Sequence, residues 1–186
     1  MKTVNIISLT TLSVAFLLAP ALRADTSVKL SGVHLCCKGC VTGVQDATAK
    51  VQGAKVEVDK DAGTVAITAP SAEVAQKAVN AVVAAGYYGT SSDASIKARD
   101  ASKMKDQKVQ SLEVKGVHLC CKKCVDAAVK AISSVEGVKG NNAEKDAKSF
   151  TVTGDFNAKD VFVALNKAGF AGRGPNDGKG KGKKKK

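Results

Sequence analysis

The chain of 186 residues contains no tryptophan and few other aromatic side chains, with two tyrosines and five phenylalanines. Its basic C-terminal segment, residues 175–186, holds no aromatic residue on which nucleic-acid bases could stack, so specific nucleic-acid recognition is not expected. There is also no Gly-rich phosphate loop, and no carboxylate pair set beside a histidine. These absences argue against phosphoryl-transfer and hydrolytic enzymes.

Long hydrophobic runs are also scarce, and the only one lies at the N-terminus. Lys2 precedes an apolar stretch over residues 4–18, which small residues follow. This stretch is short for a membrane span of about 20 residues, and Ser and Thr interrupt it. Residues 19–21 fit an A-x-A cleavage site, and Ala24 is a second candidate. We therefore expect residues 1–24 to be a signal peptide and the mature protein to be exported, either periplasmic or secreted. A retained anchor is the alternative.

Positive charge is in excess and gathers at the C-terminus. The formal net charge is +12, and residues 175–186 (PNDGKGKGKKKK) combine lysines and glycines with a single acidic residue. Such low-complexity sequence cannot form a core and is expected to be a disordered tail. The alternative is weak contact with an anionic surface such as lipid, a cell-wall polymer or nucleic acid.

A ten-residue repeat is the most informative feature that is present. Residues 32–41 read GVHLCCKGCV and residues 116–125 read GVHLCCKKCV, and together they contain all six cysteines and both histidines. A repeat at this spacing indicates two copies of one small domain. We place the first domain at residues 25–91 and the second at 110–174, joined by a polar linker at 92–109.

The hydrophobic pattern predicts the same elements in both copies. In the first, Val28 and Leu30 alternate with polar residues as in a strand, and a helical stripe follows the cysteines. Two alternating segments flank a turn at residues 61–63, Ser71 can cap a second helix, and Tyr87 and Tyr88 begin a last strand. The order βαββαβ predicts an α+β fold of two tandem ferredoxin-like sandwiches.

The cysteines crowd into five residues of each copy, where disulfides would close loops too small to stabilise a domain. Each copy holds an odd number of thiols, three, and each contains a C-x-x-C pair between the first strand and the first helix. The partial positive charge of a helix N-terminus lowers thiol pKa values, and Lys38, Lys122 and Lys123 are expected to act in the same direction. Two thiolates one helical turn apart suit a soft cation such as Cu(I), Hg(II) or Zn(II).

Three features together resemble the heavy-metal-associated domain family. They are the C-x-x-C pair, Val-x-Gly after the first helix (residues 51–53 and 135–137), and Ala-Gly-Tyr/Phe after the second (residues 85–87 and 168–170). Exported members of this family resemble periplasmic mercury-binding proteins, and cytosolic relatives are copper chaperones and modules of copper-transporting ATPases. The resemblance implies binding and hand-over of a soft metal ion, with a metal-donor or acceptor protein as partner. The ligands it implies are Cys37, Cys40, Cys121 and Cys124.

The chain departs from that family pattern near the thiols. Gly32 precedes Cys37 by five positions instead of three, and Leu35 and Leu119 stand where the family has methionine. The additional Cys36 and Cys120 are either third thiolate ligands or spare thiols packed as small apolar side chains.

His34 and His118 are likewise either metal ligands or structural residues that hold the loop. We call the two cysteine-containing repeat segments, residues 32–41 and 116–125, the thiol loops. Tyr87 and Phe170 are expected to be core residues that pack beneath them.

Two other functions remain open at this point. A C-x-x-C pair at a helix N-terminus is also the arrangement of dithiol–disulfide exchange proteins. The three prolines, at positions 20, 70 and 175, do not supply the cis-proline surroundings of thioredoxin-like sites. The domains could also be interaction modules with Cys37–Cys40 and Cys121–Cys124 oxidised. Of the three, metal binding by a non-enzymatic protein is the interpretation that the sequence favours.

Overall fold

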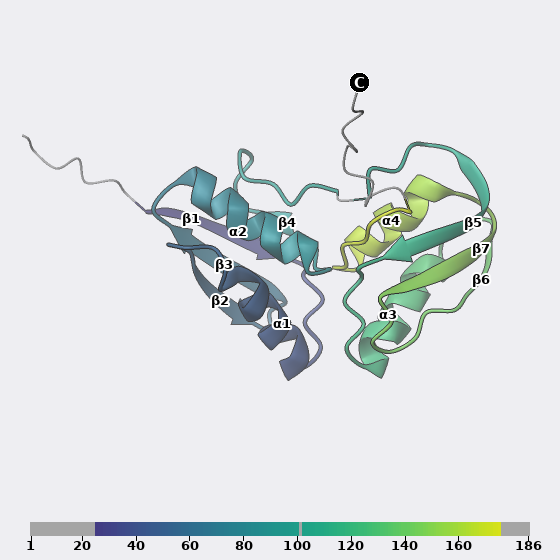
Figure 1. Cartoon of the computed structure of the whole chain (residues 1–186), viewed down its shortest axis with the longest axis horizontal. Coiled ribbons are helices and arrows are strands. Elements are labelled where there is room, and N and C mark those ends of the chain that lie inside the picture. Colours follow the sequence, from purple (N-terminus) through teal and green to yellow (C-terminus); the bar gives the residue numbers. More distant parts are fainter. Residues whose placement is uncertain (1–24, 101, 176–186) are drawn as a thin grey trace, which may run out of the picture.

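Two α+β units lie side by side in the computed structural model, which describes residues 25–100 and 102–175 (Figure 1). The first consists of β1 (Thr26–Ser31), α1 (Lys38–Thr48), β2 (Lys55–Asp59), β3 (Thr64–Ala69), α2 (Ala72–Ala84) and β4 (Thr90–Ser91). The second consists of β5 (Lys108–Lys115), α3 (Lys122–Ser133), β6 (Val138–Asn141), β7 (Ser149–Asn157) and α4 (Ala158–Lys167). The predicted fold class, two ferredoxin-like units, is confirmed. The expected signal peptide, and the tail beyond Pro175, lie outside the described residues.

The two sheets are antiparallel and share one topology. The first has the order β2-β3-β1-β4 and the second β5-β7-β6. In the described part of the second unit, the segment after α4 pairs with its own sheet through a single bridge, between Lys115 and Arg173. This bridge places that segment beside β5, as β4 lies beside β1. The last predicted strand is therefore regular in the first unit and reduced to one bridge in the second.

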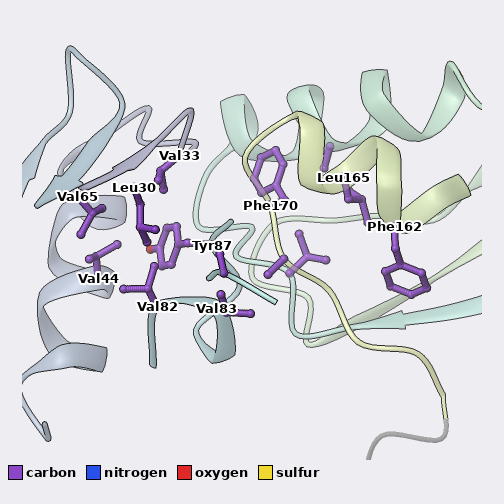
Figure 2. Packing of buried hydrophobic residues seen from close by; sticks show 14 of the residues in the cluster. Leu30, Val33, Val44, Val65, Val82, Val83, Tyr87, Phe162, Leu165 and Phe170 are labelled. Carbon is purple, nitrogen blue, oxygen red and sulfur yellow. The ribbon is translucent and has the colours of Figure 1, made fainter. Parts of the chain in front are cut away.

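The helices cover the sheets with the faces that the periodicity predicted. The cluster of fully buried side chains includes Val44 from α1, Val82 from α2, Ile132 from α3 and Leu165 from α4. Figure 2 shows Tyr87 in the core of the first unit, near Leu30, Val44 and Val82. It shows Phe170 beside α4 of the second unit. Both rings are only 1% exposed, so the prediction that they are core residues is confirmed.

Polar side chains begin the second helix of each unit. The Ser71 hydroxyl accepts a hydrogen bond from the backbone N–H of Val74 at the start of α2. Asn157 does the same for the N–H of Lys159 at the start of α4. Each cap satisfies a backbone donor that the helix itself leaves unpaired, as predicted for Ser71.

The segment between the units is packed, although its sequence showed no core spacing. Ile96 is 2% exposed, and Ala98 is also buried. The side-chain amide of Gln76 on α2 bonds to both the N–H and the carbonyl oxygen of Lys97, each at 3.0 Å. A single isoleucine creates no periodicity, which explains why the pattern did not predict this contact.

None of the helices in the described part of the chain is both long and apolar enough to span a membrane.

Backbone hydrogen bonds join the two units directly. Tyr87 and Phe170 form an antiparallel bridge, in which the N–H of Tyr88 donates to Gly169 O and the N–H of Ala171 donates to Gly86 O, both at 3.0 Å. The prediction that Tyr87 and Tyr88 begin the last strand is therefore wrong. That strand begins at Thr90, because the residues before it pair with the other unit.

Glycine makes this close approach of the two units possible. Gly86 and Gly169 have φ of +93° and +86°, in the left-handed region. A Cβ at Gly86 would lie 2.5 Å from the carbonyl oxygen of Gly116, and one at Gly169 would lie 2.5 Å from that of Gly32. The Ala-Gly-Tyr/Phe segments of the two copies thus form the joint between the units.

Candidate metal centre

The two thiol loops face one another across the junction between the units (Figure 1). In each loop the residues alternate in burial. Val33 and Leu35 are buried in the first loop, and Val117 and Leu119 in the second. Because successive side chains of an extended segment point in opposite directions, His34 and Cys36 project away from the core in which Val33 and Leu35 are buried. The buried leucines thus anchor the loops to the core.

Each C-x-x-C pair begins a helix, as predicted from the sequence. Cys37 is the N-cap residue of α1 and Cys121 that of α3. Cys40 and Cys124, in the first helical turn, are fully buried. The backbone N–H groups at both helix N-termini therefore lie beside sulfur atoms, where they favour negative charge.

All six cysteine sulfurs form one cluster, and none of the six is in a disulfide. The Sγ atoms that touch are 3.3–3.9 Å apart. Within the first C-x-x-C pair the Sγ–Sγ distance is 3.7 Å, and it is also 3.7 Å within the second. The buried sulfurs Cys40 and Cys124, one from each domain, are 3.7 Å apart. Two sites predicted from separate repeats are therefore a single group of sulfurs.

The extra cysteine of each domain lies against the C-x-x-C pair of the other. Cys120 Sγ is 3.5 Å from Cys37 Sγ and 3.6 Å from Cys40 Sγ. Cys36 Sγ is 3.4 Å from Cys121 Sγ and 3.3 Å from Cys124 Sγ. Of the two interpretations of these extra thiols, the geometry favours third ligands, because each completes a three-sulfur group with the opposite domain.

The histidines also cross the junction, and each stacks on an aromatic ring of the other unit. His34 stacks on Phe170 with ring centroids 4.4 Å apart, and His118 stacks on Tyr87 at 4.5 Å. Within the described residues, both Nε2 atoms are buried without a hydrogen-bond partner. His34 shares a possible ligand group with Cys36 and Cys124, in which the ligand atoms lie within 4.8 Å of one another. Burial lowers the pKa of His34, which favours the neutral ring that a metal ligand needs.

The close sulfurs share protons unequally. A hydrogen bond from Cys124 lowers the pKa of Cys40 to about 2, and the same contact raises the pKa of Cys124. Burial raises the pKa of Cys36 to about 12 and also raises that of Cys120. The backbone N–H of Cys124 lowers the pKa of Cys121 to about 7. The predicted effect of the helix N-terminus is thus present at Cys121, whereas burial favours the protonated form of Cys36 and Cys120.

A cation can replace the protons that hold these sulfurs together. Six thiolates at contact distance repel one another strongly unless positive charge lies between them. Of the nearby lysines, Lys122 forms an ion pair of 2.8 Å with the Asp126 carboxylate on the exposed face of α3, which offsets part of its charge. The donor set fits a soft metal ion.

Comparisons with known proteins are sparse. Neither a protein-family model nor a curated protein matches the chain. Among solved structures, the N-terminal soluble domains of Bacillus subtilis CopA are similar at 15% identity and a TM-score of 0.33, over 82% of this chain and 95% of that one. The first two RRM domains of yeast Pub1 are similar at 9% identity and a TM-score of 0.23, over 81% and 99% of the two chains. At such values neither similarity identifies a relative.

Proposed function

We propose that this chain is an exported protein that binds soft heavy-metal ions through its cysteines, for sequestration or transfer. The observation that carries the proposal is the gathering of all six sulfurs, from loops 84 residues apart, into one group of contacts as short as 3.3 Å. Thiolates favour Cu(I), Zn(II) and other soft ions over hard ones. The resemblance of both repeats to heavy-metal-associated domains supports the same function, as well as transfer to or from a partner protein.

The chemistry of the site favours binding over catalysis. Cys40 and Cys124 are fully buried, and every sulfur touches another sulfur of the site. A metal ion held among such sulfurs leaves no obvious position for a substrate.

Export through a signal peptide at residues 1–24 would place the protein where free thiols oxidise unless a metal protects them. The Lys-rich tail would add weak contact with anionic surfaces.

Metal retention by the reduced protein tests the proposal. The full mature chain, prepared anaerobically, is mixed in turn with Cu(I), Hg(II) and Zn(II), separated from free ions and analysed for metal and for reactive thiols. We expect metal to be retained and thiol labelling to be suppressed. A variant with serine at Cys37, Cys40, Cys121 and Cys124 should lose retention. If none of the three ions is retained at micromolar concentration, the proposal is wrong.

One observation favours a second candidate, dithiol–disulfide exchange. The pKa of Cys121 is lowered to about 7, and its partner Cys124 lies 3.7 Å away. A partly ionised thiol beside a second thiol is the arrangement that attacks disulfides. Turnover in an insulin-reduction assay, abolished by Cys121→Ser, would support this function. Metal retention without such turnover would support the first.

A further inference from the structure

Four groups of three can be chosen among the six sulfurs so that each sulfur belongs to two groups. Three groups have their sulfurs mutually within 4.8 Å: Cys36, Cys37 and Cys121; Cys37, Cys40 and Cys120; and Cys120, Cys121 and Cys124. The fourth consists of Cys36, Cys40 and Cys124, whose Sγ–Sγ distances are 3.9, 3.7 and 3.3 Å. Six points joined in this way are the corners of a distorted octahedron, of which the four groups are alternate faces.

We propose that this arrangement binds four Cu(I) ions as one cluster shared by both domains. The inference rests on the proposed function and specifies its metal, its stoichiometry and its ligands. Each copper lies at one three-sulfur face, and each cysteine bridges two coppers. Cys36 and Cys120 are therefore full members of the site, equal to the C-x-x-C cysteines.

The sulfur spacing suits an ion with three sulfur ligands. With a metal–sulfur bond of about 2.3 Å, a planar three-sulfur site needs sulfurs about 4.0 Å apart. The observed contacts of 3.3–3.9 Å reach this value with a small expansion. Two tetrahedral Zn(II) ions would use the six sulfurs unequally, with two of them bridging and four bound to one ion each, whereas the observed groups treat all six alike.

Charge balance favours four Cu(I) ions over a smaller number of Cu(I) ions. Six thiols that lose their protons to solvent carry six negative charges, and four Cu(I) ions leave a core of charge −2, with no change of oxidation state. The N-termini of α1 and α3 meet at this core, and their partial positive charges stabilise an anion. Four ions thus remove most of the repulsion among the sulfurs, whereas two Cu(I) ions would leave a charge of −4.

The surroundings of the cluster limit contact with water. Cys40 and Cys124 are fully buried, and the two histidine–aromatic stacks lie across the junction beside them. The joint at Gly86 and Gly169 holds both thiol loops against each other without help from a metal, because its hydrogen bonds are between backbone atoms. The six sulfurs are therefore positioned together before copper arrives, which lowers the cost of forming the cluster.

Anaerobic titration of the reduced full chain with Cu(I), followed by native mass spectrometry, tests the stoichiometry. We expect the metal-free and four-copper forms to dominate, with little of the one-, two- and three-copper forms. X-ray absorption of the loaded protein should show three sulfurs per copper and a copper–copper scattering contribution.

Single substitutions test the role of the extra cysteines. Cys36→Ser and Cys120→Ser each remove a sulfur from two of the four groups, so the four-copper form should disappear and Cu(I) affinity should fall at least tenfold. Lys50→Ala is the control, since this exposed residue follows the far end of α1 in the same unit and carries no sulfur. It should keep the four-copper form.

Each contrary outcome separates this inference from the proposed function. An end point of two coppers with two sulfurs each, unchanged by Cys36→Ser, would overturn the cluster and leave metal binding intact. Retention of two Zn(II) ions without a four-copper form would do the same. Failure to retain any soft metal would overturn both. Circular dichroism of the metal-free variants shows whether they are folded, and a variant that is not folded is replaced by Cys36→Ala or Cys120→Ala.

Discussion

The hydroxyl of Tyr87 donates a hydrogen bond to the backbone carbonyl oxygen of Cys40, over a distance of 3.0 Å. Burial raises the pKa of this phenol, so it remains a donor. The hydroxyl lies against Gly43 of α1, where an added Cβ would overlap it. In the second repeat Phe170 and Ala127 stand at the corresponding positions. In the first repeat, the hydroxyl of Tyr87 faces a glycine, which has no side chain. In the second repeat, Phe170 has no hydroxyl, and alanine, with a methyl group, stands in place of the glycine.

This relationship predicts that Gly43→Ala destabilises the protein more strongly while the Tyr87 hydroxyl is present. The overlap should lower the free energy of unfolding by about 1–3 kcal/mol. In the Tyr87→Phe background the same change should cost less, because only the His118 ring, 3.0 Å from the added Cβ, still crowds it and alanine favours helix over glycine. Urea unfolding of the four reduced, metal-free proteins measures the coupling. Additive effects of the two substitutions would contradict the prediction.

The joint between the domains predicts a different effect for Gly169→Ala. The Cβ would meet the backbone of Gly32 and His34 in the other domain, so the thiol loops should separate and the affinity for soft metal should fall at least tenfold. Gly53→Ala is the matched control. Its φ of +82° brings a similar backbone strain of about 1 kcal/mol, but its Cβ would meet only Pro70 and Val74 of its own domain. Equal loss of affinity in both variants would show that strain alone is responsible.

The pKa of Cys36 predicts how the stability of the metal-free protein depends on pH. Its folded value is raised from 9.0 to about 12, so the unfolded chain loses this proton at a lower pH than the folded protein does. A raised pKa contributes stability below the unfolded value and loses it as pH rises, so the free energy of unfolding should fall between pH 9 and about 12. Cys120 and Cys124 act in the same direction, because their pKa values are also raised. Cys40 and Cys121, whose pKa values are lowered, oppose them and reduce the net decrease.

Chelator-treated, reduced protein unfolded with urea at pH 8, 9 and 10 measures this dependence. Cys36→Ser should show a smaller decrease over the same range, because one of the contributing thiols is absent. Metal-loaded protein should instead become more stable over this range, because its sulfurs are already deprotonated while the unfolded chain still loses thiol protons. A stability that rises from pH 8 to 10 in the metal-free protein would be incompatible with crowded, protonated thiols.

The segment between the domains is predicted to be part of the first domain's core. Ile96→Ala removes a side chain that is 2% exposed and should lower the free energy of unfolding by about 2–4 kcal/mol. The neighbouring Lys97→Ala is the control, because its side chain is exposed and Gln76 bonds only to its backbone. If both substitutions change stability by less than about 0.5 kcal/mol, this segment does not pack in solution.

Most of the individual elements could be predicted from sequence, because the physical causes are local. Val28 and Leu30 alternate along β1, and Ser71 caps α2. The placement of Cys37 at a helix N-terminus followed from the change between a strand pattern and a helix pattern. The start of the last strand was predicted three residues early, because Tyr87 bonds to the other domain instead of to β1.

The sequence by itself determined that the chain has two similar domains and that each presents three thiols beside a helix N-terminus, because periodicity and spacing act between near neighbours. Only the tertiary structure decided that the two sets of thiols become one centre. That result depends on how the domains are oriented, and the orientation comes from contacts such as Tyr87 with Phe170 and His34 with Gly169. Residues so far apart leave no periodic trace in the sequence, so their meeting could not be predicted from it.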